Sequence, residues 1–304
     1  MRPVILESPY KGNNYETTEE NIRFARLCMH DCLLRGEAPF ASHLLYTQEG
    51  VLDDKIPKER TLGIEAGFAW KDVADATVVY VNRGISKGMH LGIRRTIVRG
   101  QPIEYRSLPA YEKLAQPVIV TITGASGVGK TSIIKRFLEV RPCARLIQST
   151  TSRSARPSDL DGEYEYGVAV NDFEKHKDDF LWMATAHGNH YATRRKSVSE
   201  IWLRRESFCP GCMILVPHVL PLLRNYLVDC DRLVSFYVLS PSEEELRRRL
   251  TVRGDDEATI QRRIDDCKKW GAEALRADIP YVFLSNNESD VGIEMAVEQM
   301  CVFL

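Results

Sequence analysis

A glycine-rich segment that ends in a lysine and a hydroxyl residue is the clearest candidate for chemistry in this sequence. It comprises Gly124, Ala125, Ser126, Gly127, Val128, Gly129, Lys130 and Thr131. Glycines let backbone N–H groups turn toward phosphate oxygens, where a Cβ would block them, and a following helix N-terminus adds partial positive charge. Lys130 can reach the β- and γ-phosphates, and the Thr131 hydroxyl can ligate Mg²⁺. The segment predicts a P-loop that binds ATP with Mg²⁺ as its cofactors.

The elements on either side of this segment support that interpretation. An apolar, β-branched run from Val118 to Thr123 predicts a strand directly before it, and Thr131 to Val140 predicts the helix directly after it. A strand, a tight loop and a helix in this order are the context in which a P-loop works.

The chain after the P-loop contains several arginines, whose side chains suit phosphate oxygens. Arg153 and Arg156 stand three residues apart, and Arg249, Arg253 and Arg263 follow in a later basic stretch. Guanidinium groups pair with phosphate oxygens in a bidentate manner, and phosphoryl transfer needs positioning and charge neutralisation rather than a covalent catalyst. For Arg247 and Arg248, a solvated helix face is the preferred interpretation.

In order and spacing, these segments resemble the guanylate kinase family over residues 118 to 287. Besides the P-loop, the runs that carry the resemblance are Ser149 to Arg156, Asp159 to Tyr166, Phe180-Leu181, His187 to Thr193, Pro241 to Gly254 and Ile260 to Ile264. The resemblance implies a P-loop nucleoside-monophosphate kinase fold and ATP-dependent phosphorylation of a nucleoside monophosphate.

The resemblance also implies a role for individual residues. Catalytic roles fall to Lys130, Arg249, Arg253 and Arg263, the arginines belonging to a lid over ATP. A tyrosine that holds the acceptor phosphate corresponds to Tyr164 or Tyr166, and Asn286 or Asn287 corresponds to an asparagine near the adenine. The implied acceptor set is Arg153, Arg156, Tyr166, Trp182, Tyr191 and Thr193; Thr131 is the implied metal ligand.

Two departures from the family pattern concern the acceptor base and the metal. Trp182 follows Phe180-Leu181 where the family has a glutamate that reads guanine, and the run Met213 to His218 has no carboxylate where the family has aspartates. A local slip of the alignment is the competing explanation. We therefore expect an acceptor other than GMP, and the protein ligands of Mg²⁺ beyond Thr131 stay open.

The first third of the chain alternates apolar β-branched runs with helical ones, which predicts a parallel sheet covered on both faces. We expect a Rossmann-like domain at residues 1–108, a linker at 109–116 and the kinase domain at 117–304, all in the α/β class. The expected elements are a strand at Val4–Glu7, a helix capped by Thr17 or Thr18 and ending near Arg35 before Gly36, an extended or loop segment at Pro39–Tyr46, a helix from Pro57 to about Val73, a strand at Thr77–Asn82, a helix at Gly88–Arg99 and a strand at Pro102–Tyr105.

This first domain is similar to the nucleoside 2-deoxyribosyltransferase-like family. The similarity rests on Ser8-Pro-Tyr10, Glu65-x-Gly67, Asp72 to Tyr80 and Ile85 to Met89. It implies a pocket lined by Ser8, Tyr10, Asp72, Ser86, Gly88 and Met89, with Asp72 either an assisting acid or a solvated cap at a helix end. The family's nucleophilic glutamate corresponds to Gly92, which cannot attack an anomeric carbon, and Glu65 is a weak substitute.

Composition sets the remaining expectations. A net charge of −1 over 304 residues gives no hint of a nucleic-acid or membrane surface, and no apolar run is long enough for a signal peptide or a membrane span. We expect a cytoplasmic protein, and a homo-oligomer through the N-terminal domain stays open. The eight cysteines include one isolated CxxC motif, Cys209 to Cys212. We expect all eight to be free thiols that bind no zinc.

Three other functions compete with a kinase that carries an N-terminal nucleotide-binding domain. The chain could be an N-glycosidase or deoxyribosyltransferase with an accessory kinase fold, a non-catalytic nucleotide-binding module, or a simple NTPase. The intact P-loop lysine and lid arginines disfavour the module, and Arg153 and Arg156 disfavour the NTPase.

Overall fold

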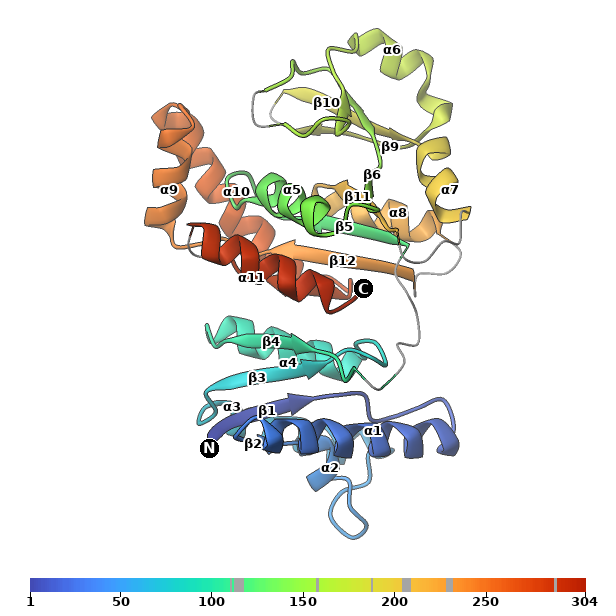
Figure 1. Cartoon of the computed structure of the whole chain (residues 1–304), viewed down its shortest axis with the longest axis vertical. Coiled ribbons are helices and arrows are strands. Elements are labelled where there is room, and N and C mark those ends of the chain that lie inside the picture. The colour runs from blue at the N-terminus through green and yellow to red at the C-terminus, as the bar shows by residue number, and fades with distance from the viewer. Residues whose placement is uncertain are drawn as a thin grey trace. The chain divides into compact units, whose positions relative to one another are not determined.

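The computed structural model describes residues 1–109, 111, 118–156, 159–186, 188–203, 209–227, 232–286 and 289–304. The chain forms two compact units, residues 1–115 with Phe303 and residues 116–302 with Leu304 (Figure 1). Most of the expected linker, residues 109–116, lies outside the described residues. None of the helices in the described part of the chain combines the length and hydropathy that crossing a bilayer requires.

The first unit is a parallel four-stranded sheet with helices between its strands. Its elements are β1 (Arg2–Glu7), α1 (Tyr15–Leu34), β2 (Glu37–Phe40), α2 (Ser42–Leu45), α3 (Pro57–Lys71), β3 (Ala76–Tyr80), α4 (Lys87–Val98) and β4 (Ile103–Arg106). The strand order is β2-β1-β3-β4, and all three pairings are parallel. Right-handed crossovers then place α1 on one face and α3 and α4 on the other.

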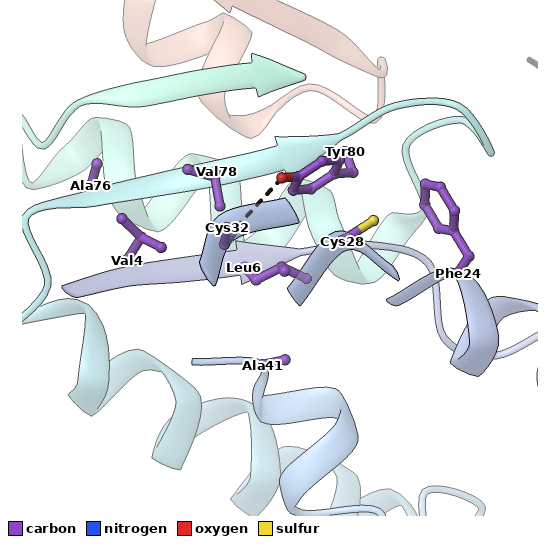
Figure 2. Packing of buried hydrophobic residues seen from close by; sticks show 9 residues of the cluster. All are labelled: Val4, Leu6, Phe24, Cys28, Cys32, Ala41, Ala76, Val78 and Tyr80. Atoms are coloured by element: carbon purple, nitrogen blue, oxygen red, sulfur yellow. Dashed lines mark hydrogen bonds between the residues drawn. The ribbon is translucent and has the colours of Figure 1, made fainter. Parts of the chain in front are cut away.

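The core under α1 shows how the strand residues divide between the two faces. Val4, Leu6, Val78 and Tyr80 alternate along β1 and β3 and pack with Phe24, Cys28 and Cys32 of α1, as Figure 2 shows. The Tyr80 hydroxyl lies 3.5 Å from the Cys32 Sγ. Burial raises the pKa of Cys28 and, to about 11, that of Cys32, so both are protonated core thiols, as expected for free cysteines.

Several element boundaries in this unit differ from the sequence-based expectation. The N-cap of α1 is Asn14, whose side chain accepts from the backbone N–H of Thr17, so a cap at Thr17 or Thr18 is wrong. Gly36 follows the helix in the left-handed region, at φ 77°, as expected. The segment Pro39 to Tyr46 is not a simple loop, because it contains the end of β2 and the short helix α2.

The second unit contains two sheets. Its elements are β5 (Ile119–Thr123), α5 (Lys130–Val140), β6 (Arg145–Leu146), β7 (Ser149–Thr151), β8 (Tyr164–Glu165), α6 (Val170–Lys175), a 3₁₀ turn (Lys177–Asp179), β9 (Phe180–Ala186), β10 (Asn189–Arg194), α7 (Arg195–Leu203), β11 (Gly211–Ile214), a 3₁₀ turn (Pro217–Val219), α8 (Leu220–Tyr226), β12 (Leu233–Val238), α9 (Glu243–Val252), α10 (Glu257–Arg276), β13 (Tyr281–Leu284) and α11 (Ser289–Cys301).

The larger sheet is parallel, with strand order β13-β12-β5-β11-β6, so β5 lies at its centre. All five residues of β5 are buried, as a strand covered on both faces requires. The smaller sheet, β8-β7-β10-β9, contains antiparallel pairs and stands apart from the larger one in Figure 1. The chain is therefore an α/β protein with a parallel-sheet unit followed by a unit whose larger parallel sheet carries the glycine-rich loop directly after its central strand.

Candidate active site

A cavity of about 350 Å³ lies where the P-loop, the smaller sheet and helices α9 and α10 meet. Residues from all these elements line it: Gly124, Ser126, Gly127, Gly129, Lys130, Thr131, Ser132, Arg153, Arg156, Asp159, Glu163, Tyr164, Trp182, Tyr191, Ile214, Leu215, Val216, Arg249, Arg253, Arg263 and Trp270. The predicted P-loop and the predicted acceptor arginines therefore share one cavity.

The P-loop has the backbone that its glycines allow. Gly124 and Gly129 have φ values of 140° and 99°, and a Cβ on Gly129 would lie 2.2 Å from the Asn286 Nδ2. That amide donates to the Val128 carbonyl at 2.8 Å, which ties the loop to the end of β13. Asn286 thus supports the loop from behind, while Asn287 lies outside the described residues.

Lys130 follows the loop at the first position of α5. Its Nζ donates to the carbonyls of Gly124 and Ala125 at 2.8 and 2.6 Å. Burial lowers the pKa of Lys130 to about 8. A phosphate group in the cavity would offer the ammonium a stronger, charged acceptor than these two carbonyls.

Arg153 forms an ion pair with the carboxylate of Asp159 at the cavity wall. Its Nη1 and Nη2 donate to the two Asp159 oxygens at 2.7 and 2.9 Å, and the side chains are only 9% and 11% exposed. Burial raises the pKa of Asp159, but hydrogen bonds from Arg153 and the Arg156 backbone outweigh it and hold that pKa below its ordinary value. Arg156 itself is exposed at the cavity wall.

Tyrosine rings surround the Arg153 guanidinium. It lies 5.2 Å from the ring centre of Tyr164 and 5.3 Å from that of Tyr166. Tyr164 and Tyr191 both line the cavity, and their ring centres lie 5.9 Å apart. Tyr166 does not line the cavity, so of the two tyrosines considered for the acceptor phosphate, Tyr164 is the one at its wall. Tyr164 is the first residue of β8, whereas Tyr166 lies just beyond the end of that strand.

Trp182 is buried at the wall of this cavity. It is 5% exposed, lines the cavity from β9 and pairs across the sheet with Thr193 of β10. Its Nε1 finds no hydrogen-bond partner among the described residues. Thr193 is fully buried and is not part of the lining; its hydroxyl lies 2.7 Å from the Ser149 hydroxyl, so contact with the cavity through Thr193 is also wrong.

The lid arginines are held by nearby carboxylates or hydroxyls. Arg249 donates to Glu245 at 2.7 Å and to the Asn286 carbonyl at 3.1 Å. Arg263 pairs with Asp255. Arg253 reaches Ser126 of the P-loop at 3.4 Å. All three arginines line the same cavity as Arg153 and Arg156, so they add further positive charge to it.

Three lining residues carry chemistry that the sequence did not predict. Asp159 and Glu163 add carboxylates on the acceptor side, and burial raises the pKa of Glu163. Trp270 of α10 adds a second indole, two helical turns after Arg263. The spacing of Trp270 from Arg263 was a usable signal, because residues seven apart share one helix face.

Few side chains in this cavity can serve as ligands of a divalent cation. Thr131 lines the cavity, whereas the residues that line it after β11 are Leu215 and Val216. Across the described residues, no three His, Cys, Asp or Glu side chains gather closely enough to hold a metal ion. Mg²⁺ commonly keeps several waters and takes substrate phosphates as ligands, so one hydroxyl beside a phosphate cradle fits it.

The N-terminal unit has a cavity of its own, about 490 Å³ in volume. Ser8, Tyr10, Ser86, Gly88 and Met89 line it, as expected. Asp72 does not: it caps the end of α3, forms an ion pair with Arg99 and is 45% exposed, so its assignment to this pocket is wrong. Glu65 is exposed on α3 and outside the lining as well.

Glu7, at the end of β1, also lines this cavity. Its Oε1 accepts from the Nζ of the buried Lys71 at 2.9 Å, and the Glu7 side chain is 15% exposed. A Cβ at Gly92 would lie 1.9 Å from Glu7 Oε1, so the absence of a side chain at residue 92 leaves room for this carboxylate.

Comparison with known proteins assigns the two parts of the chain to different families. The profile of the guanylate kinase family matches residues 115–290, and that of a domain of unknown function, DUF7768, matches residues 2–106. The N-terminal match supplies no link to deoxyribosyltransferases.

Individual relatives match the C-terminal part. Guanylate kinase from Syntrophus aciditrophicus is 31% identical over 62% of this chain and 86% of its own. Guanylate kinase from Aromatoleum aromaticum is 33% identical over 56% of this chain and 80% of its own. A crystal structure of guanylate kinase from Anaplasma phagocytophilum covers 61% of this chain and 82% of its own at 19% identity, with a TM-score of 0.44.

Proposed function

The chain belongs to the guanylate kinase family, and from that premise we propose that it transfers the γ-phosphoryl group of ATP to a (deoxy)nucleoside monophosphate whose base is not guanine. It is a phosphotransferase of the nucleoside-monophosphate kinase class. The observation that carries the proposal is the single cavity lined by both Lys130 of the P-loop and Arg153 of the smaller sheet. The P-loop and the acceptor-side arginines can then bind the two phosphate groups that take part in one reaction.

The residues on the donor side bind and neutralise the triphosphate. Backbone N–H groups around Gly127 and Gly129 cradle the phosphates, and Lys130 leaves the carbonyls of Gly124 and Ala125 to bind them. Mg²⁺, held by Thr131 and by phosphate oxygens, supplies further charge neutralisation when bound. Further positive charge around the transferring phosphoryl group comes from Arg249, Arg253 and Arg263.

The residues on the acceptor side orient the second nucleotide. Arg153 and Arg156 bind its phosphate, with Tyr191 and Tyr164 as hydroxyl donors at the same wall. Holding donor and acceptor phosphates next to each other in one cavity supplies much of the rate enhancement that phosphoryl transfer needs.

Trp182 is the reason to exclude guanine. The guanine edge presents an N–H and an amino group, both hydrogen-bond donors, whereas Trp182 offers an apolar face and one indole donor. Each donor left unpaired in a closed site costs about 1–3 kcal/mol. The two nearby carboxylates, Asp159 and Glu163, accept hydrogen bonds from Arg153 and from the Leu160 N–H. The acceptor base is therefore one that does not present these two adjacent donors, such as a pyrimidine or a modified base.

A coupled ATP-consumption assay tests this proposal. The acceptors to compare are GMP, dGMP, dAMP, dCMP, dTMP, dUMP and several base-modified monophosphates, each by kcat/KM. We expect the best acceptor to exceed GMP by at least tenfold. If GMP or dGMP has the highest kcat/KM, a carboxylate in this cavity reads guanine. If none of these acceptors is phosphorylated, the kinase proposal is wrong.

A nucleotide-binding role for the N-terminal unit is a second proposal. It is supported by the cavity of about 490 Å³, which is within the usual range of about 300–1,000 Å³ for small-molecule sites. Fluorescence or calorimetric titration of nucleotides into a full-length protein with a disabled kinase site tests it.

A further inference from the structure

The corner between helices α9 and α10 brings an acidic residue to the lid arginines. Arg253 caps the end of α9, and Asp256 caps the start of α10. Asp255 lies between these two caps, and its Oδ2 accepts from Nη1 of Arg263 on α10. The corner thus supplies a carboxylate partner to one of the arginines that line the kinase cavity.

The way in which α9 ends fixes the backbone at Asp255. Gly254 lies in the left-handed region, at φ 86°. The N–H of Gly254 donates to the Thr251 carbonyl at 2.9 Å, and the N–H of Asp255 donates to the Leu250 carbonyl at 3.2 Å. These two bonds form a Schellman motif, in which the chain turns back onto the last turn of the helix. The carboxylate of Asp255 therefore extends from a backbone that two hydrogen bonds hold in place.

The ion pair of Asp255 and Arg263 is largely shielded from water. The Arg263 side chain is 8% exposed and that of Asp255 is 14% exposed. The Nε of Arg263 is buried as well, and it finds no hydrogen-bond partner in the part of the chain that the structure describes. A shielded guanidinium without its carboxylate is strongly unfavourable, so the position of this guanidinium depends on Asp255.

A second arginine increases the need for this counter-ion. Arg253 also lines the cavity, and its pKa lies below the ordinary value because partial burial and the positive charges of neighbouring arginines, Arg263 first, act on it. The charge of Asp255 acts on that pKa in the opposite direction. Arg253 and Arg263 therefore repel each other in one cavity, and the carboxylate of Asp255 offsets this repulsion.

Asp255 itself does not line the cavity, whereas Arg249, Arg253 and Arg263 do. Its carboxylate therefore acts on a bound nucleotide through the arginine that it holds, and it does not take up space that phosphate oxygens need. A charge that stabilises the transition state of phosphoryl transfer contributes most when its position is fixed in advance.

We propose that Asp255 is a positioning residue for phosphoryl transfer, which holds the Arg263 guanidinium beside Arg253 before the nucleotides bind and while they react. Because the carboxylate offsets the repulsion between the two arginines, both guanidinium groups are in place when the triphosphate enters. Arg263 then neutralises charge that develops on the transferring phosphoryl group. This inference rests on the proposed kinase function and adds to it a residue outside the cavity.

Steady-state kinetics of full-length variants test the inference. Asp255→Asn removes the charge and keeps the size of the side chain. The matched control is Asp256→Asn, which removes the neighbouring, exposed carboxylate but keeps the cap of α10, since asparagine caps helices as well as aspartate does. Asp255→Asn is also made in an Arg263→Met background, which completes a double-mutant cycle. The acceptor is the best monophosphate of the ATP-consumption assay, and the thermal unfolding midpoint of each variant is measured alongside.

We expect Asp255→Asn to lower kcat by about tenfold or more, and to change KM for ATP and for the acceptor by less than about threefold. Stabilisation of the transition state is lost in this variant, whereas the groups that bind both nucleotides remain. Asp256→Asn should keep kcat within about twofold. In the Arg263→Met background, Asp255→Asn should change kcat by less than about threefold, because the group through which it acts is gone.

Asp255→Glu covers the case in which Asp255→Asn does not fold because Arg263 is left without a counter-ion. The glutamate keeps the charge but moves the carboxylate by one methylene. We expect it to lower kcat by about fivefold or more at an unfolding midpoint close to that of the unchanged protein. Unchanged kcat in folded Asp255→Glu protein would count against a positioning role.

The outcomes separate this inference from the proposed function. If the unchanged protein phosphorylates no monophosphate, the kinase function fails and the inference fails with it. If the unchanged protein is active and Asp255→Asn matches Asp256→Asn, the function stands and the inference is wrong. An equal loss of kcat with and without Arg263 would show that Asp255 acts through another group. A rise in KM at unchanged kcat would assign Asp255 to nucleotide binding, and either result would overturn the inference.

Discussion

Asp159 grips Arg153 through two parallel hydrogen bonds of 2.7 and 2.9 Å at the acceptor wall of the kinase cavity. The pair fixes the guanidinium in place before any phosphate arrives, with rings of Tyr164 and Tyr166 on its faces. It also means that an acceptor phosphate must share Arg153 with a carboxylate. Arg153 is thus a preorganised cation at the wall of this cavity.

Replacing Arg153 should weaken binding of the acceptor monophosphate rather than binding of ATP. We expect Arg153→Ala to raise KM for the acceptor monophosphate by about ten- to a hundredfold, since a charge-assisted contact to phosphate is lost, with KM for ATP changed by less than threefold. Steady-state kinetics with each substrate varied in turn provide the measurement. Arg248→Ala, on an exposed side chain that pairs with Glu245, is the control. Equal rises in both KM values would place Arg153 outside the acceptor site.

Lys130→Ala should abolish phosphoryl transfer and leave the fold intact. The ammonium contacts loop carbonyls rather than the hydrophobic core, so its loss opens no core cavity. Loss of its charge at the transferring group should lower kcat by at least a hundredfold. Turnover and the thermal unfolding midpoint are measured together, with the exposed Lys135→Ala on the same helix as control. Near-normal turnover in folded Lys130→Ala protein would refute the kinase proposal.

Binding of ATP should take up a proton above pH 8. The pKa of Lys130 is lowered by burial from its ordinary 10.5 to about 8, so at pH 8.8 the side chain is mostly neutral in the free protein. Triphosphate oxygens favour the ammonium and raise its pKa again, so ATP binding draws a proton from the buffer. Calorimetry at pH 8.8 and 7.0, in two buffers of different ionisation enthalpy, measures the uptake.

The control for that measurement is Lys130→Arg, because a guanidinium stays protonated throughout this range. We expect uptake of roughly 0.5–1 proton at pH 8.8 in the unchanged protein and little at pH 7.0. The arginine variant should show little at either pH. The same uptake in both proteins would assign the proton to another group.

A carboxylate at position 182 should move the enzyme toward guanine. Trp182→Glu places two acceptor oxygens where the indole lies, so kcat/KM for GMP relative to that for the best natural acceptor should rise by about tenfold or more. Met183→Glu is the matched control, because the neighbouring residue on β9 is 42% exposed. An unchanged ratio in folded Trp182→Glu protein would mean that residue 182 does not face the acceptor base.

The N-terminal unit should not release bases. Gly92 provides no nucleophile, and Glu65 is exposed outside the cavity. We expect full-length protein carrying Lys130→Ala to release no free base above background from deoxynucleosides or their monophosphates over hours. Chromatography of the reaction mixture provides the measurement. Release that disappears with Glu7→Gln would instead identify Glu7 as a catalytic carboxylate.

The sequence predicted best those features that a short stretch of chain determines by itself. The strand, glycine loop and helix around Lys130 appear where expected, since local glycine spacing and β-branched runs determine them. The N-cap of α1 was missed because Asn14 and Thr17 both have cap-forming side chains, and the choice depends on how the chain enters the helix.

Contacts that depend on tertiary structure could not be predicted in this way. Asp159 was visible in the sequence only as part of a short acidic run, and its pairing with Arg153 depends on the fold of the loop between β7 and β8. The removal of Thr193 from the cavity depends on its bond to Ser149, 44 residues away. Local periodicity carries no information about such pairs, and tertiary packing decides them.

The fit of Glu7 over Gly92 also restricts how this protein can diverge. A descendant that gains any side chain at residue 92 must shorten or move the one at residue 7, because both cannot occupy the same volume. Lys71 would then lose its counter-ion inside the unit. Related sequences should therefore change these three positions together or keep all three, a pattern of joint substitution that spans 85 residues of chain, from 7 to 92.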